Sequence, residues 1–187
     1  TTPDPITLNR LLGRMADEGC KYAFMEVSSH SIAQKRIGGL KFVGGIFTNI
    51  TRDHLDYHKS FDDYFAAKAL LFNHILDEGA AAVINIDDPR GRQMAMIARE
   101  RGLALTTIGR DGAADLRILG QRYDATGQDL RFSWHGNPHL VRLPLIGGFQ
   151  AENVLAAAGL VMAAGDEPAR VFETLPGLST VRGRMEL

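Results

Sequence analysis

Hydrophobic and polar residues alternate along the first two thirds of the chain with spacings typical of helices and strands. An amphipathic pattern predicts a helix that is capped by Thr7 and ended by Gly19. Short apolar runs predict buried strands at 22–27, 45–50, 81–86 and 103–108. Helical patterns lie between them at 60–77 and 90–101. Strands that alternate with helices predict an α/β fold, with a mainly parallel sheet flanked by helices.

The pattern changes near Asp115. Three runs of alternating apolar and polar residues, separated by turns near 126–127 and 136–138, predict a small antiparallel β-meander at about 115–146 with one solvated face. Helical patterns follow at 150–164 and 167–174. Residues 1–178 are therefore expected to form one domain that includes this antiparallel part.

Lys68 interrupts the apolar stripe of the predicted helix 60–77. At helical spacing it shares a face with Phe65 and Phe72, and Ser60 is the expected cap. A buried ammonium group is costly unless it is paired, deprotonated or chemically modified. Snorkelling of the head group towards solvent is the alternative. Because acids and imidazoles are concentrated just upstream at 52–58, both interpretations stay open.

Glu26 lies near the carboxyl end of the expected strand 22–27, the edge at which open α/β sheets bind ligands. A carboxylate there can hold Mg²⁺, although a solvated glutamate fits the position equally well. His54 could hold a hard metal together with Glu26. The four-residue spacing of His54 and His58 lacks the His-Glu-x-x-His signature, which argues against a zinc protease. We interpret the remaining candidates as surface or packing histidines: His58, His74, His135 and His139.

Two further segments carry polar groups at expected strand-to-helix or loop-to-helix junctions. Ser28, Ser29 and His30 lack the Gly-x-Ser-x-Gly pattern of a nucleophile elbow, so phosphate binding or helix capping is favoured over nucleophilic catalysis. Gly147-Gly148-Phe149-Gln150 leads into the helix that contains Asn153, and amides there suit a nucleotide base or sugar, while a plain helix start is the alternative. The sequence contains neither a Gly-x-x-x-x-Gly-Lys-Ser/Thr phosphate loop nor a dinucleotide-binding Gly-x-Gly-x-x-Gly motif.

Composition narrows the class of protein. The 187 residues are 45% hydrophobic and 23% charged, which is ordinary for a globular domain. A net charge of −1 gives no general attraction to nucleic acid or to an anionic membrane. The single cysteine excludes an internal disulfide framework and fits a reducing compartment. We expect a cytoplasmic protein with no nucleic-acid or membrane partner, and the two ends of the sequence suggest a piece of a longer protein.

A series of motifs resembles the Mur ligases of bacterial cell-wall synthesis, above all the UDP-N-acetylmuramoyl-tripeptide synthetases. The motifs follow the family's order along the chain: Thr1-Thr2-Pro3-Asp4, Met25-Glu-Val-Ser-Ser-His30, Phe47-Thr-Asn-Ile-Thr-Arg-Asp-His-Leu-Asp-Tyr-His58, Asp63-Tyr64 with Ala66-Ala-Lys68, Asn85 with Asp87-Asp88, Gly148-Phe-Gln150 with Asn153, and Gly183-Arg-Met-Glu186. Each motif is modest alone, but the ordered series is specific.

The resemblance implies the central ATPase domain of a three-domain ligase, without its phosphate loop, and a hinge at 179–187 into a further domain. Such enzymes use ATP and Mg²⁺ to convert the terminal carboxylate of UDP-MurNAc-L-Ala-D-Glu into an acyl phosphate. The amine of a diamino acid, meso-diaminopimelate or L-lysine, then attacks to give an amide. A monomeric parent enzyme is expected, and the isolated piece is expected to be inactive.

The resemblance also implies roles for individual residues. Glu26 and His54 match metal ligands, and Lys68 matches a lysine that family members carry as a carbamate, an anion able to orient a second Mg²⁺. Positions that match contacts to the UDP-MurNAc-dipeptide are Thr1, Thr2, Ser28, Gln34 and Arg36. Residues of the nucleotide-side motifs are Asn85, Gln150 and Asn153, and Arg184 matches an arginine that reaches the ATP phosphates. Gln150 stands where many members have asparagine.

Three other functions compete with this interpretation. A folylpolyglutamate synthetase-like ligase is disfavoured by Met25–His30 followed by Arg36. A non-catalytic domain that binds nucleotide or UDP-sugar is disfavoured by the combination of metal-ligand candidates with Lys68. A metal-dependent hydrolase, which would act without ATP, is the third.

Overall fold

One six-stranded sheet runs through the part of the chain that the structure describes. The computed structural model describes residues 2–51 and 58–179. The strands are β1 (Gly44–Phe47), β2 (Ala81–Asn85), β3 (Ala104–Gly109), β4 (Leu116–Asp124), β5 (Gly127–Trp134) and β6 (Asn137–Leu143). They lie side by side in the order of the sequence. Strands β1 to β4 are parallel, and β4, β5 and β6 are antiparallel. The mainly parallel fold and the meander are confirmed, and the meander continues the parallel sheet.

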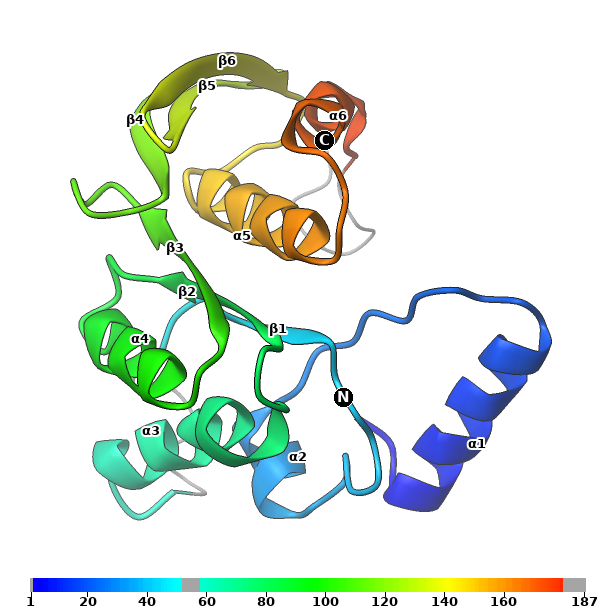
Figure 1. Cartoon of the computed structure of the whole chain (residues 1–187). Helices are drawn as coiled ribbons and strands as arrows, with labels where there is room; N and C mark the ends of the chain where they lie inside the picture. Colours follow the sequence, from blue (N-terminus) through cyan, green and yellow to red (C-terminus); the bar gives the residue numbers. More distant parts are fainter. Residues whose placement is uncertain (1, 52–57, 180–187) are drawn as a thin grey trace.

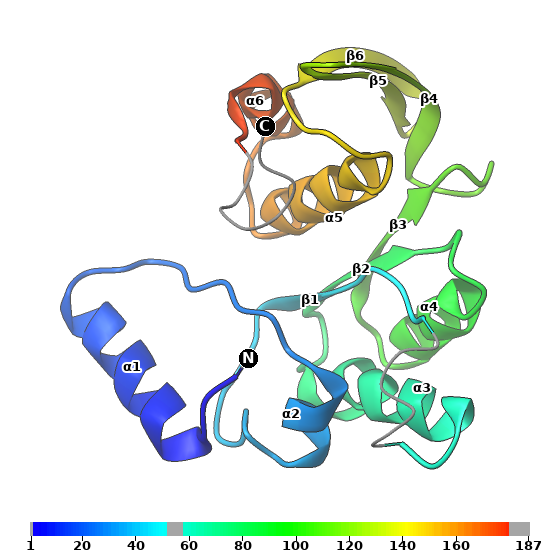
Figure 2. The same cartoon turned by 180° about the vertical axis from the view of Figure 1, so that it is seen from behind.

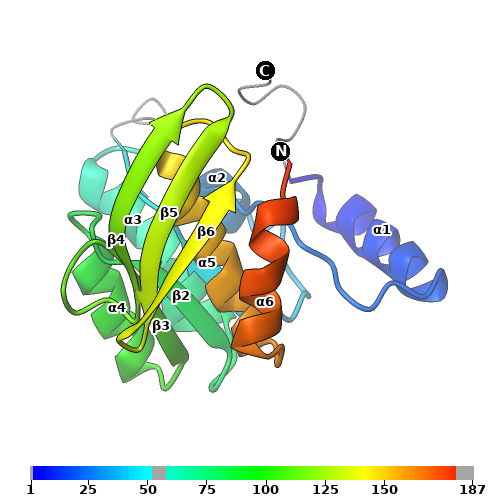
Figure 3. The ribbon, with the colours of Figure 1, turned by 90° about the horizontal axis from the view of Figure 1, so that it is seen from above.

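Helices cover both faces of this sheet. Helices α3 (Phe61–Leu70) and α4 (Gly91–Glu100) lie on one side of β1–β3, and α5 (Phe149–Ala163) and α6 (Pro168–Thr174) lie on the other (Figure 1). Seen from above, the three antiparallel strands extend over α5, with α6 at the margin (Figure 3). The helices predicted at 60–77, 90–101, 150–164 and 167–174 are therefore confirmed, within a few residues at their ends.

The two faces bury separate apolar clusters, because successive side chains of a strand point to opposite sides. In β2, Val83 packs into the cluster that includes α5, whereas Ala82 and Ile84 pack into the cluster that includes α3 and α4. All five residues of β2 are buried. The sheet is therefore covered on both faces at its parallel end, as the continuous apolar run 81–86 predicts.

The prediction of a strand at 22–27 is wrong. These residues take no place in the sheet, and the side chains of Tyr22 and Phe24 are 62% and 74% exposed. An apolar run becomes a strand only where a neighbouring backbone supplies hydrogen bonds, and the described sheet has β1 at its edge. The segment leads instead from α1 (Pro5–Asp17), which projects away from the sheet, to α2 (Ser29–Ala33) (Figure 2).

The predicted cap of α1 is also wrong. Asp4, not Thr7, caps the helix, and its Oδ1 accepts the backbone N–H groups of Ile6 and Thr7, each at 3.0 Å. Pro5 at the first helical position explains the earlier start, because proline has a helical φ and no N–H to leave unsatisfied. The expected end is confirmed, since Gly19 follows the helix with φ +85°.

The predicted helix 60–77 changes type at its end. Ser60 is the cap, as predicted, and its Oγ accepts the N–H of Asp63 at 3.1 Å. After Leu70 the chain forms a π-helical turn, η1 (Leu71–Ile75), closed by a 2.9 Å hydrogen bond from Leu76 N–H to Leu71 O. A short 3₁₀ turn, η2 (Leu175–Gly177), follows α6. No helix within residues 2–51 and 58–179 is both long and apolar enough to cross a membrane.

Candidate functional site

Three of the predicted substrate residues lie in one hydrogen-bonded group. Arg36 Nη1 donates to Thr2 O at 3.0 Å, and Arg36 Nε donates to Gln34 Oε1 at 2.8 Å. Thr2 is buried, and its Oγ1 donates to the backbone oxygen of Glu26 at 3.1 Å. The Glu26 side chain itself is exposed. The structure therefore brings Thr2, Gln34, Arg36 and the backbone of Glu26 together from distant parts of the sequence.

Ser28 caps α2, which confirms the capping interpretation of the Ser28–His30 segment. Its Oγ accepts the N–H of Ser31 at 3.2 Å and lies 3.3 Å from the hydroxyl of Ser31. The side chain is half-buried. A hydroxyl held in this way at a helix start is oriented by the backbone and not by an adjacent base, as a nucleophile would be.

Lys68 is half-buried, between the alanines 67 and 69, which are both buried. Its Nζ lies 5.3 Å from the centre of the Tyr64 ring, close enough for a cation–π contact. Burial lowers the pKa of Lys68, and the Asp88 carboxylate partly opposes this change. The lysine is thus neither fully in the core nor freely exposed to water. Because its pKa is lowered, a larger fraction of it is in the neutral amine form than for a surface lysine.

Asp88 organises the backbone near Lys68. It is 9% exposed, and its Oδ2 accepts the N–H of Ile50 at 2.8 Å, while its Oδ1 accepts the N–H of Arg90 at 2.8 Å. These bonds join the segment after β1 to the start of α4. Asp88 belongs to a sequence motif that gives it no separate role, and its separation of 38 residues from Ile50 leaves no local signal of this contact.

His58 is a buried packing residue, as interpreted, but with a specific polar partner. It is 7% exposed, and its Nε2 lies 2.9 Å from Ser29 Oγ. Its ring stacks on Tyr64 with 5.0 Å between ring centres. Of the three other histidines that were given the same interpretation, His74 and His135 are exposed, and His139 packs against Phe132 and Phe172.

Three candidate residues, Thr1, His54 and Arg184, lie outside the described residues. Within 2–51 and 58–179, no group of three or more His, Cys, Asp or Glu side chains is arranged to hold a metal ion. Mg²⁺ requires oxygen donors, which Glu26 has and the amine of Lys68 lacks. Lys68 would therefore offer oxygen donors to such a cation only if its amine carried an added carboxylate.

Asn85 and Glu152 meet at the carboxyl end of β2. Asn85 is 4% exposed; its Nδ2 donates to Glu152 Oε2 at 3.4 Å, and its Oδ1 accepts the N–H of Asp87 at 3.0 Å. Burial raises the pKa of Glu152, Asp87 raises it further, and Arg110 opposes both. This edge of the sheet is where open α/β folds bind nucleotides.

Gln150 lies near this group, in the first turn of α5. Its N–H donates to Gly147 O at 3.1 Å, so the turn that precedes α5 is closed by backbone groups. The Gln150 side chain is half-buried, and Asn153 is exposed one turn later. Asn85, Gln150 and Asn153 thus lie at neighbouring element ends, but only Asn85 is buried.

Two glutamines that were not predicted from the sequence hold this turn from the sheet side. Gln128 is fully buried, and its Nε2 donates to Leu145 O and Gly147 O, each at 3.1 Å. Gln121 Nε2 donates to Gln128 Oε1 at 2.7 Å and to Gly148 O at 3.0 Å. A hollow of about 410 Å³ beside the turn is lined by Tyr123, Asp124, Gly127, Ile146, Gly147 and Gly148. The sequence signal for such a residue is an amide at a position where an alternating strand otherwise carries apolar side chains.

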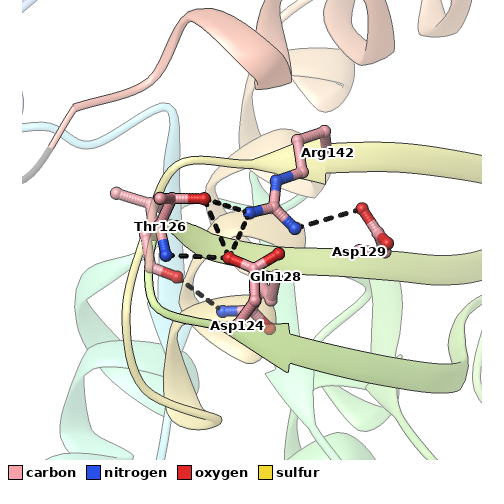
Figure 4. Close-up of polar contacts among 6 residues, drawn as sticks. Asp124, Thr126, Gln128, Asp129 and Arg142 are labelled. Carbon is pink, nitrogen blue, oxygen red and sulfur yellow. Dashed lines mark hydrogen bonds and ion pairs between the residues drawn. The ribbon is translucent and has the colours of Figure 1, made fainter.

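The solvent side of the meander carries an ion-pair cluster centred on Arg142 (Figure 4). Its Nη2 donates to Asp124 Oδ1 at 2.6 Å and to Thr126 Oγ1 at 2.7 Å, and its Nη1 donates to Asp129 Oδ1 at 3.3 Å. The hydrogen bond from Arg142, together with those from Thr126, lowers the pKa of Asp124. The cluster joins the three antiparallel strands at the surface.

The fold and these motifs define a known class of domain. Residues 1–161 match the model of the Mur ligase middle domain, and the chain belongs to this family. It is 48% identical over 191 residues to the UDP-N-acetylmuramoyl-L-alanyl-D-glutamate–2,6-diaminopimelate ligase of Phocaeicola vulgatus. The matched region covers all of this chain and 37% of that protein. The chain is 42% identical to the ligase of the same name from Agrobacterium fabrum, covering all of this chain and 38% of the relative.

Solved structures agree. A structure of a ligase with that name superimposes with a TM-score of 0.90 at 31% identity, covering all of this chain and 38% of the other. MurF ligase from Thermotoga maritima in complex with ADP gives a TM-score of 0.64 at 22% identity over 76% of this chain and 32% of its own, which shows the fold alone. The chain thus spans a little more than a third of the length of these two curated ligases, 37% and 38%.

Proposed function

We propose that the chain is the middle domain of an ATP-dependent ligase that joins 2,6-diaminopimelate to UDP-MurNAc-L-Ala-D-Glu in peptidoglycan synthesis. The proposal is supported by relatives with 48% and 42% identity that bear the name of this activity. The domain proper is 1–178, and 179–187 leads as a hinge into a further domain. We infer that the parent enzyme is a monomer.

The proposed reaction has two steps. The terminal carboxylate of the UDP-MurNAc-dipeptide attacks the γ-phosphorus of ATP, the bond to the β–γ bridging oxygen breaks, and ADP leaves. The amine of diaminopimelate then attacks the acyl carbon, phosphate leaves, and an amide forms. Mg²⁺ bound by Glu26, His54 and modified Lys68 would neutralise charge on the transferring phosphoryl group.

The half-buried position of Lys68 is the structural observation that carries the proposal. A carbamate forms when a neutral amine attacks CO₂, with one new C–N bond and loss of one proton from nitrogen. Burial lowers the pKa of Lys68 and so favours the neutral amine that this step requires. The product is an anion with two oxygen donors, which removes the cost of a partly buried ammonium and suits a hard cation.

Two further sets of residues are proposed to bind the two substrates. The UDP-MurNAc-dipeptide is proposed to be bound by the group of Thr2, Gln34 and Arg36, together with Thr1 and Ser28. Asn85, Gln150, Asn153 and Arg184 serve the nucleotide. Gln128 and Gln121 support that side, because they hold the backbone turn from which α5 begins.

ADP release by the full-length parent enzyme tests the function. The assay contains Mg-ATP and UDP-MurNAc-L-Ala-D-Glu, with meso-diaminopimelate or L-lysine added separately. Release that requires the nucleotide sugar and diaminopimelate is expected, and L-lysine serves as the matched diamino-acid control. Absence of release with either amino acid, or release on a folate substrate, would contradict the proposal. The isolated chain is expected to form no product.

A further inference from the structure

A buried hydrogen bond joins α2 to the segment that leads into α3. His58 Nε2 lies 2.9 Å from Ser29 Oγ, and the two residues are 7% and 2% exposed. Burying an imidazole and a hydroxyl costs free energy that an apolar pair of similar size would avoid. Unlike an apolar pair, a hydrogen-bonded pair favours one relative geometry of the two side chains.

The contacts of His58 continue towards Lys68. Its ring stacks on Tyr64 with an interplanar angle of 23°, and Lys68 Nζ lies over the same Tyr64 ring at 5.3 Å from its centre. Tyr64 is 4% exposed, so the ring cannot turn aside into solvent. Lys68 is one helical turn after Tyr64 on α3, and the position of its head group therefore depends on how that ring is held.

The contacts that run from Lys68 through Tyr64 and His58 end at Ser29, beside a residue that is proposed to bind substrate. Ser29 is the first residue of α2 and follows Ser28, the capping residue proposed to contact the UDP-MurNAc-dipeptide. The His30 ring also lies near His58, at 5.5 Å between centres. Side chains in contact thus lead from the start of α2 to Lys68 through buried positions.

We propose that His58 is a positioning residue that couples the substrate-side turn at Ser28 and Ser29 to Lys68 through the Tyr64 ring. It does not touch substrate; it holds the start of α2 and the Lys68 face of α3 in one relative arrangement. The inference rests on the proposed function, since its consequence is measured as ligation. It predicts that loss of the Ser29–His58 bond lowers turnover more than it weakens ATP binding.

The test uses the full-length enzyme with Ser29→Ala, His58→Phe, the double variant and His58→Gln. His58→Phe keeps a ring on Tyr64 but removes the hydrogen bond, and His58→Gln retains a polar group for Ser29. His139→Phe is the matched control, because His139 also stacks on an aromatic ring, Phe132 at 5.1 Å, but lies on β6. Melting temperature, kcat, and KM for each substrate are measured for every variant.

Ser29→Ala and His58→Phe are each expected to lower kcat about tenfold, the effect of losing one buried hydrogen bond that is felt in the transition state. The double variant should lose no more than His58→Phe alone, because Ser29→Ala then removes a bond that is already absent. His58→Gln should recover part of kcat, and His139→Phe should change the melting temperature only.

Wild-type kcat in a folded Ser29→Ala or His58→Phe enzyme would overturn the inference, as would additive losses in the double variant. If His58→Phe does not fold, Ser29→Ala alone decides, since it removes one oxygen atom. Failure of the proposed function is separately visible, because the wild-type enzyme would then release no ADP with the dipeptide substrate and diaminopimelate.

Discussion

The polar cluster around Asp88 and the ion-pair cluster around Arg142 differ more in burial than in charge. Arg142 has two carboxylate partners, but its side chain and those of Asp124 and Asp129 are 36%, 55% and 47% exposed. Asp88 accepts two backbone N–H groups within the described residues and is 9% exposed. Water can replace the partners of an exposed charge, but not those of a buried one. The Arg142 cluster is therefore expected to contribute less to the free energy of unfolding, although it contains more charged groups.

Lys68→Ala in the parent enzyme tests the buried side of this comparison with the largest expected effect. We expect ADP release to fall at least about a hundredfold, as when a group that stabilises transferring charge is removed. Short carboxylic acids added to the assay should restore part of the activity by replacing the carbamate oxygens. Normal activity in the variant would refute the role of Lys68.

Lys68→Met separates stability from activity. Because the pKa of unmodified Lys68 in the folded protein lies below its ordinary value of 10.5, the unfolded state binds more protons between these two values, and stability rises with pH there. Under CO₂-free conditions, the inactive variant should therefore unfold at higher urea concentration than the wild type at pH 7. That advantage should shrink as the pH approaches 10.5. A pH-independent difference would contradict the assigned cause.

Asp88→Ala should destabilise the enzyme by about 1–3 kcal/mol, because it leaves the buried Ile50 N–H without its acceptor. Asp88→Asn keeps one carbonyl oxygen and should cost less. Urea unfolding of both variants beside Asp129→Ala, an exposed carboxylate of the other cluster, gives the comparison directly. Equal losses for Asp88→Ala and Asp129→Ala would show that burial does not set the order.

Gln128→Leu tests whether a buried polar group far from Lys68 supports the nucleotide side. The carbonyl groups of Leu145 and Gly147 would lose their donor, and we expect KM for ATP to rise about tenfold. KM for the dipeptide substrate should stay unchanged. Gln93→Leu, on the exposed face of α4, is the control. An unchanged KM for ATP in a folded Gln128→Leu enzyme would mean that the turn is held by other contacts.

Arg142→Ala is expected to have the smallest effect. The pKa of Asp124 should return towards its ordinary value, since the hydrogen bond from Arg142 is the main cause of its lowering. The stabilisation is present above that ordinary value and is lost as the pH falls through the lowered one. Urea midpoints at low and high salt should differ little from those of the wild type, and less at high salt. A loss as large as that of Asp88→Ala would reverse the comparison.

Periodicity alone predicted most of the fold, because helices and strands express local spacing. The alternating runs located β4 to β6, and the apolar run 81–86 located β2. It failed at 22–27, where a strand depends on a neighbour that local pattern does not specify. It also missed the start of α1, where Pro5 makes Asp4 the better cap.

Sequence can point to a candidate site where a single residue type is unusual at its position, such as a charged residue on an apolar stripe. Lys68 was such a residue, and the structure finds it half-buried with a lowered pKa. The supporting groups were not predictable, since Ser29 and His58 are 29 residues apart and Ile50 and Asp88 are 38 apart. Such pairs have ordinary local sequences, and only the fold brings them together.

The order of the strands has a consequence for synthesis. Every strand of the sheet pairs with the strand that precedes or follows it along the chain. A chain that leaves the ribosome from its N-terminus can add each strand to an edge that already exists, without waiting for a distant segment. Loop closure between neighbours is also entropically cheaper than closure over long separations. Within the described residues, each strand from β2 to β6 is therefore expected to pair during translation with a strand that has already been synthesised.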